Sequence, residues 1–94
     1  MRSKTDRQFR GHFAKLPPDV QQRAHAAFQL WIRDPFDRKL KFKRLQHSEP
    51  LYSVRIGKRW RALGLWEGDV IVWIWIGPHD EYLHVIRTYP RSLR

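Results

Sequence analysis

Residues 51–76 read LYSVRIGKRWRALGLWEGDVIVWIWI, and their pattern of apolar residues predicts three consecutive β-strands. In the first strand, Tyr52, Val54 and Ile56 occupy alternate positions, so their side chains share one face of a sheet. Residues 70–76 are apolar at every position, as expected of a strand that is covered on both faces. We therefore expect a β-sheet in which residues 70–76 form the core strand.

Short turns and less regular segments connect and flank these strands. Residues 57–58 and 67–69 contain glycine and polar residues that favour tight turns, which pair consecutive strands antiparallel. Earlier in the chain, Leu40 and Phe42 alternate with lysines, so a further strand is expected there. Beyond the core strand, residues 80–87 fit either a short helix or another strand.

Two helices are expected before the sheet. Phe9, Phe13 and Leu16 are spaced so that they lie on one helical face, and two prolines follow them. A second helix begins at Asp19, repeats apolar residues at the same spacing and ends at Asp34. We expect the two helices to form an αα-hairpin with one shared apolar face.

Length and composition indicate one small domain, residues 1–94. The chain is 41% hydrophobic and 14% aromatic, which can supply one dense core but not two. It has no cysteine, which excludes a disulfide framework and a cysteine nucleophile and fits a reducing cytoplasm. Residues 1–10 are too charged for a secretory signal, and residues 70–76 are too few to cross a membrane as a helix. We expect a soluble, cytoplasmic α+β protein, with an N-terminal αα-hairpin packed on a small antiparallel β-sheet.

Positive charge is concentrated in the middle of the chain. The formal net charge is +10, and residues 38–61 contain nine Lys or Arg residues but a single acidic one. Such a charge attracts nucleic acids, acidic membrane surfaces and acidic proteins. Because side chains alternate along a strand, Arg55 can share a face with Arg59 and Arg61 of the neighbouring strand, with Lys41 and Lys43 nearby. Guanidinium groups gathered there would suit phosphate, although the same pattern also fits an ordinary solvated face.

Two residues beyond the core strand are candidates for proton transfer and stacking. His79 follows a Gly-Pro pair, where a loop can direct its side chain past the end of the sheet. Its ordinary pKa of about 6.5 suits proton transfer at neutral pH. A solvated or capping histidine is the alternative. Tyr82 could stack on a nucleic-acid base or pack in the core.

The sequence gives little reason to expect a metal ion or a cofactor. His12, His25, His47 and His84 lack the HxH and HExxH spacings of metal sites. The chain also has no glycine-rich phosphate loop and no GxSxG nucleophile motif. We expect neither a metal nor a cofactor.

The two-helix start followed by residues 51–82 resembles the RelE/ParE superfamily of type II toxin-antitoxin toxins. The most specific segments are YSVRIGKRWRALG and WIGPHDEY. The resemblance covers nearly the whole chain and implies a RelE-like microbial ribonuclease fold, with the active cleft on the sheet face opposite the helical hairpin. For ribosome-dependent members it implies cleavage of mRNA in the decoding site by attack of a ribose 2′-hydroxyl on the adjacent phosphorus.

The resemblance also implies roles for individual residues. Arg61 matches the arginine that stabilises the scissile phosphate, and Arg55 matches a basic residue one strand earlier. His79 matches a proposed general acid for the 5′-oxygen, and Tyr82 falls near an aromatic residue that orients the substrate. The basic residues expected to bind substrate are Lys41, Lys43, Lys58 and Arg59.

One position departs from the family pattern. Ser53 stands where the best-known member has lysine, so the resemblance assigns no general base. Lys43, His47 and Glu49 are the local substitutes.

The leading hypothesis is a ribosome-dependent mRNA endonuclease, a metal-independent enzyme whose partners are the ribosome, mRNA and an acidic antitoxin. The antitoxin segment is expected to fold onto the basic surface and cover the cleft. One alternative is a ParE-like poison of DNA gyrase, which needs no catalytic histidine. Another is a relative without nuclease activity that only binds nucleic acid.

Overall fold

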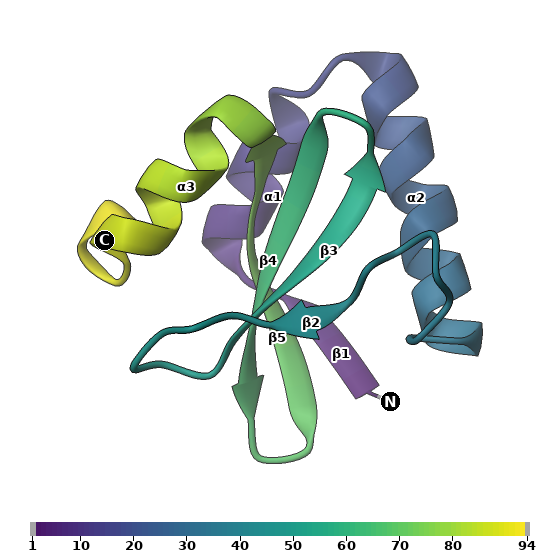
Figure 1. Ribbon diagram of the computed structural model, residues 1–94. Helices are drawn as coiled ribbons and strands as arrows, with labels where there is room; N and C mark the ends of the chain where they lie inside the picture. Colours follow the sequence, from purple (N-terminus) through teal and green to yellow (C-terminus); the bar gives the residue numbers. More distant parts are fainter. Residues whose placement is uncertain (1, 94) are drawn as a thin grey trace.

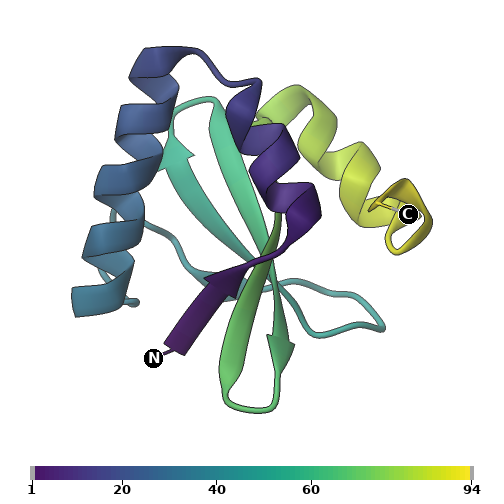
Figure 2. The same ribbon diagram turned by 180° about the vertical axis from the view of Figure 1, so that it is seen from behind.

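The computed structural model describes residues 2–93 and has an α+β fold (Figure 1). In chain order the elements are β1 (Arg2–Thr5), α1 (Arg7–Ala14), α2 (Pro18–Arg33), β2 (Lys43–Arg44), β3 (Leu51–Gly57), β4 (Trp60–Glu67), β5 (Val70–Pro78), α3 (His79–Thr88) and a short 3-10 helix (Arg91–Leu93). The strands form one sheet in the order β1-β5-β4-β3-β2, and every neighbouring pair is antiparallel except β1 and β5. Figures 1 and 2 show α1 and α2 on one side of the sheet and α3 on the other.

The three strands predicted in residues 51–76 are present as β3, β4 and β5. Lys58 and Arg59 form the first turn, one residue later than predicted, and the second turn contains Gly68. Gly68 has a φ of 62°, a left-handed conformation that glycine adopts without strain. β5 lies between β1 and β4, and its residues 71–77 are all buried, so the predicted core strand is confirmed.

A separate core lies on each face of the sheet. On one face, Trp31 of α2 packs edge-on against Trp73 of β5, with 5.3 Å between ring centroids. On the other face, Tyr82 of α3 belongs to the same buried cluster as Leu63 of β4 and Trp75 of β5. The two cores explain why β5 is apolar at nearly every position.

β5 contains one residue more than the facing part of β4. Gly64 pairs with Trp73, but the preceding Leu63 pairs with Trp75, which leaves Ile74 as a β-bulge. The bulge interrupts the alternation of side chains. Trp73 and Trp75 therefore lie on opposite faces of the sheet, although they are two residues apart.

α1 and α2 form the predicted hairpin. The Asp6 carboxylate accepts a hydrogen bond from the Phe9 N–H at 2.8 Å and so caps the start of α1. α2 begins at Pro18, one residue before the predicted start, because proline suits the first helical turn, where its missing N–H costs nothing. The helix ends at Arg33, next to the predicted end at Asp34.

Two segments differ from the sequence-based predictions. β1 was not predicted, because its four residues are polar and all exposed, with no alternation to mark a strand. The strand expected at residues 40–43 is reduced to the two residues of β2. Lys41 has a φ of 46°, which interrupts the extended chain, although the Leu40 carbonyl still accepts a hydrogen bond from the Arg55 N–H at 2.7 Å.

The alternatives left open for residues 80–87 are resolved in favour of a helix, α3, which follows β5 directly. None of the helices within residues 2–93 is long and apolar enough to cross a membrane.

Candidate functional site

Arg55 and Arg61 occupy directly opposite positions on β3 and β4. Opposite residues of an antiparallel pair project from the same face, which here is the face that α3 covers. Both side chains donate to the Gly57 carbonyl, Arg61 Nη1 at 2.9 Å and Arg55 Nε at 3.4 Å. Arg61 Nη1 also donates to the Trp60 carbonyl at 2.9 Å. Backbone carbonyls therefore hold the two guanidinium groups close together, at the point where the register of β3 and β4 shifts.

The Arg61 guanidinium is partly buried beside a like charge. Its pKa lies below the usual value, first because burial penalises the charged form and second because Arg55 is nearby, while Tyr82 acts in the opposite direction. Arginine nevertheless stays protonated at neutral pH. The pair is a site of concentrated positive charge that a bound anion would stabilise.

His79 is the first residue of α3 and lies at the end of β5. Its backbone N–H donates to the Arg59 carbonyl at 2.7 Å, which ties the start of α3 to the turn between β3 and β4. The imidazole is exposed, and its centroid lies 5.6 Å from that of the Tyr82 ring. Tyr82 is 7% exposed, so the tyrosine predicted to stack or to pack is mainly a core residue that supports one side of His79.

One hollow of about 500 Å³, at the end of the β3–β4 hairpin, brings Arg61 and His79 together. Neither Arg55 nor Tyr82 lines this hollow. Arg55 stands opposite Arg61 on β3 but lines two other hollows, and Tyr82 packs beside His79. The other residues that line the hollow are Lys58, Arg59, Trp60, Pro78 and Asp80.

The four basic residues expected to bind substrate occupy different places. Lys58 and Arg59 line the hollow. Lys43 lies on the outer strand β2, opposite Ser53, and so projects from the same sheet face as the arginine pair. Lys41 lines a separate hollow in the loop after α2, together with Asp34 and residues 36–39.

The three substitutes considered for the general base are also dispersed. His47 packs against Tyr89, with 5.8 Å between ring centroids, and its Nδ1 accepts a hydrogen bond from the Glu49 N–H at 2.9 Å. Tyr89 follows the end of α3, whereas His79 begins that helix, and a helix of this length is about 15 Å long. His47 therefore lies near the end of α3 that is opposite His79, with Glu49 beside it, and the register of β2 places Lys43 on the sheet face of the arginine pair.

Sequence reasoning missed the role of Gly77, which stands directly opposite Arg61 on β5. A Cβ atom at Gly77 would lie 2.5 Å from Cζ2 of Trp75, so the indole occupies the space that a side chain would need. The Trp75 ring also contacts His12 of α1 edge-on, with 6.3 Å between centroids. A glycine next to an apolar strand was the available signal, because it marks a close approach of other groups to the backbone.

Within residues 2–93, no three or more His, Cys, Asp or Glu side chains are grouped so that they could hold a metal ion. The groups that line the hollow are cations, an imidazole and a carboxylate.

The fold is that of a class of small α+β proteins with several solved structures. The structure is similar to a chain of the archaeal RelE–RelB complex from Pyrococcus horikoshii OT3, with 22% identity, a TM-score of 0.65, and coverage of 83% of this chain and 93% of that one. It is also similar to the RelB–RelE antitoxin-toxin complex from Methanococcus jannaschii, with 15% identity, a TM-score of 0.69, and coverage of 85% and 94%. YafQ from Escherichia coli strain BL21(DE3) has 16% identity and a TM-score of 0.68, with coverage of 87% and 98%.

The chain belongs to the ParE-like toxin domain family, whose model matches residues 18–84. This match and the structural similarities confirm the resemblance to the RelE/ParE superfamily and the RelE-like fold inferred from the sequence. No curated protein matches the chain in sequence.

Proposed function

We propose that this member of the toxin family is a ribosome-dependent mRNA endonuclease that inhibits translation. One observation carries the proposal: Arg61 and His79 line the same hollow, with Arg55 directly beside Arg61. An RNA phosphate bound by Arg61 would lie next to an imidazole that can donate a proton.

In the proposed reaction, the ribose 2′-oxygen attacks the adjacent phosphorus and the bond from phosphorus to the 5′-oxygen breaks. The arginine pair stabilises the extra negative charge that develops on the phosphate oxygens. His79, in its protonated form, gives its proton to the departing 5′-oxygen. The products are a 2′,3′-cyclic phosphate and a free 5′-hydroxyl. Side chains perform each of these steps, so the proposed enzyme is a metal-independent endoribonuclease.

The attacking 2′-hydroxyl must also lose a proton. Lys43, in its neutral amine form, is the residue we propose to accept this proton, because the register of β2 places it on the sheet face of the arginine pair, whereas His47 packs at the far end of α3 with Glu49 beside it. Lys58 and Arg59, on the wall of the hollow, are proposed to hold neighbouring phosphates. The ribosome would supply the remaining orientation of the mRNA, so free RNA should be a poor substrate.

The proposed partners are the ribosome, its mRNA and an acidic antitoxin, and the site of action is the cytoplasm. The net charge of +10 supports both a polyanionic substrate and an acidic protein partner. Two of the similar structures are complexes of a toxin with its antitoxin, which supports the second partner.

The test is translation-coupled cleavage of a reporter mRNA with the wild-type chain, His79→Ala and Arg61→Ala. Because a general acid contributes about 10²- to 10⁴-fold, His79→Ala should reduce cleavage by that factor. Arg7→Ala is the matched control, since Arg7 is an exposed residue of α1 outside the hollow. Primer extension would show cuts within codons. Equal cleavage by His79→Ala and wild type would refute the assigned role of the histidine.

A poison of DNA gyrase is the second candidate, and the ParE-like family match favours it. This function needs no proton transfer by His79. Growth arrest with intact mRNA and linearised DNA, retained in the His79→Ala variant, would support the gyrase target over the ribosome. A chain that neither arrests growth nor slows translation would instead be a nucleic-acid-binding relative.

A further inference from the structure

A row of four aromatic side chains starts in the loop after α2 and crosses the sheet on the face that α1 and α2 cover. In order, this aromatic row consists of Phe36, Phe42, Tyr52 and Trp66. Neighbouring ring centroids are 5.8, 5.2 and 5.9 Å apart, and the Phe42 and Tyr52 rings are stacked. Phe42, Tyr52 and Trp66 are partly buried, and Phe36 is 70% exposed. The row therefore presents aromatic surface to solvent.

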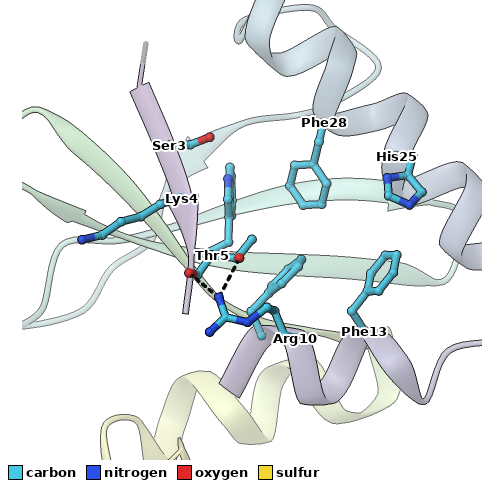
Figure 3. Close-up of a pocket in the computed structure, with 9 residues that line it drawn as sticks. Ser3, Lys4, Thr5, Arg10, Phe13, His25 and Phe28 are labelled. Atoms are coloured by element: carbon cyan, nitrogen blue, oxygen red, sulfur yellow. Dashed lines mark hydrogen bonds between the residues drawn. The ribbon is translucent and has the colours of Figure 1, made fainter. Parts of the chain in front are cut away.

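The aromatic row is the outer end of a larger aromatic cluster. The buried Trp31 of α2 contacts both Phe42 and Trp73, with 5.6 and 5.3 Å between ring centroids. Beyond Trp73, Phe28 lines an aromatic groove of about 520 Å³ between β1, α1 and α2 (Figure 3). The buried rings hold the row from behind, so its exposed surface is formed before any ligand arrives.

Positive charge borders the aromatic row. Arg44 of β2 stands directly opposite Tyr52 of β3, so its exposed side chain projects from the sheet face of the row. Lys41 is exposed as well, and together with Phe36 it lines the hollow of about 720 Å³ in the loop after α2. The other basic residues that line this hollow are Arg38 and Lys39.

Two carboxylates also line this loop hollow, and both are held by the backbone of the loop. Asp34 Oδ1 accepts a hydrogen bond from the Phe36 N–H at 3.2 Å, and Asp37 Oδ1 accepts one from the Lys39 N–H at 2.9 Å. With Arg44 included, four basic residues face two acidic ones. The border of the row therefore favours a ligand that carries negative charge.

We propose that the aromatic row is a second binding surface for single-stranded RNA, separate from the hollow at His79. Bases stack on Phe36 and against the exposed parts of Tyr52 and Trp66, while Lys41 and Arg44 contact the phosphates. Because every base has a flat π-face, such a surface binds with little sequence preference. The choice of RNA as the natural strand rests on the proposed function, but the recognition chemistry does not.

The aromatic row and the hollow at His79 lie at opposite ends of the β3–β4 pair and on opposite faces of the sheet. Tyr52 and Gly57 are five residues apart on β3, which is about 17 Å along an extended chain. Among the described residues, none of the row also lines the hollow. The row would therefore hold a part of the RNA that is not being cut, and it would add affinity without touching the reacting phosphate.

The test measures binding of a short 2′-O-methyl oligouridylate to the purified, isotopically labelled chain. The methyl group blocks the attacking 2′-oxygen, so the chain cannot cut this probe. An abasic strand with the same sugars and phosphates is the matched control, and it should bind about fivefold more weakly or worse, because it offers nothing to stack. We expect the amide resonances of Phe36, Phe42 and Tyr52 to shift with the oligouridylate.

Binding and cleavage are read out separately in this design. Binding at the row can be observed even if the chain proves to have no nuclease activity. Conversely, mRNA cleavage that depends on His79 can be observed even if the row binds no RNA.

Phe36 variants test stacking. Phe36→Ala should weaken binding of the oligouridylate by about fivefold or more, whereas Phe36→Trp should retain it. Because Phe36 is 70% exposed, both variants should keep the fold, which circular dichroism checks. Leu83→Ala is the matched control, since Leu83 is 55% exposed but lies on α3. It should change the affinity by no more than about twofold.

Arg44→Gln tests the phosphate contact. It should reduce the slope of log affinity against log salt concentration by about one, as expected for the loss of one contact. Arg7→Gln removes the same charge from an exposed position of α1 outside the row and should leave the slope unchanged.

Four results would each overturn the proposal. They are equal losses from Phe36→Ala and Leu83→Ala, equal binding of the abasic strand, resonance shifts confined to the hollow at His79, and equal salt slopes for Arg44→Gln and wild type. Sedimentation of the free chain tests the competing occupant. A dimer that Phe36→Ala dissociates, with RNA affinity unchanged, would assign the row to a second copy of the chain and would also overturn the proposal.

Discussion

The substitution Gly77→Ala tests the close packing beside the arginine pair. The added methyl group would lie 2.5 Å from Cζ2, 3.0 Å from Cη2 and 3.1 Å from Cε2 of Trp75. Trp75 is 1% exposed and sits in the core beneath α3, so its ring has little room to move. Overpacking of this kind costs about 1–3 kcal/mol. For a domain of this size, each kcal/mol lowers the melting temperature by about 4–8 °C.

We therefore expect the melting temperature of Gly77→Ala to fall by about 10 °C, for a loss near 2 kcal/mol. Gly11→Ala is the matched control, because Gly11 lies in α1 and a Cβ atom added there would have nothing within 4 Å of it. That change should raise stability, since alanine favours a helix over glycine by about 0.5–1 kcal/mol. Thermal unfolding followed by circular dichroism measures both.

A double-mutant cycle tests whether contact with Trp75 causes the loss of stability. Trp75→Phe removes part of the ring that the new methyl group would meet, so Gly77→Ala should cost less in the Trp75→Phe background than in the wild type. The packing argument for Gly77 is wrong if Gly77→Ala has the melting temperature of the wild type, or if it lowers stability by the same amount in both backgrounds.

Three further substitutions test separate features. Asp6→Ala removes the cap of α1 and should lower the free energy of unfolding by about 1 kcal/mol in urea denaturation; an unchanged midpoint would contradict the assigned cap. The pKa of His12 is lowered, first by burial and then by Lys15, so the unfolded chain takes up this proton first as the pH falls. Stability should therefore decrease below about pH 6.5, and His12→Gln should reduce that decrease; equal slopes in urea titrations would count against it. Arg61→Lys keeps the charge but loses the planar donor pair, and should lower mRNA cleavage by about tenfold in the translation assay, while full activity would show that charge alone suffices.

The elements that were predicted correctly are those whose apolar residues repeat with the spacing of a single buried face. Tyr52, Val54 and Ile56 alternate because one face of β3 packs under the helices. The parts that the pattern did not reveal depend on distant neighbours. The polar β1 is a strand only because β5 offers it a partner more than sixty residues later, and the bulge at Ile74 is invisible in a run of residues that are all apolar.

Part of the candidate site could be predicted from the sequence, for the same reasons. The pairing of Arg55 with Arg61 follows from the hairpin between β3 and β4, because a period of two and a short turn fix which residues stand opposite. The approach of His79 to Arg61 does not follow from any local rule. It depends on the start of α3, which the His79 N–H ties to the Arg59 carbonyl.

Taken by itself, the sequence determined the helical hairpin, the three-stranded meander, the concentration of positive charge and the arginine pair, because spacing and charge within short segments are local properties. Tertiary structure alone decided which groups share a cavity. It places His79 and Arg61 in one hollow and His47 near the far end of α3, and it forms an aromatic groove between β1, α1 and α2. Cavities form where segments distant in the chain meet, and the packing that brings them together is a property of the whole domain rather than of any one segment.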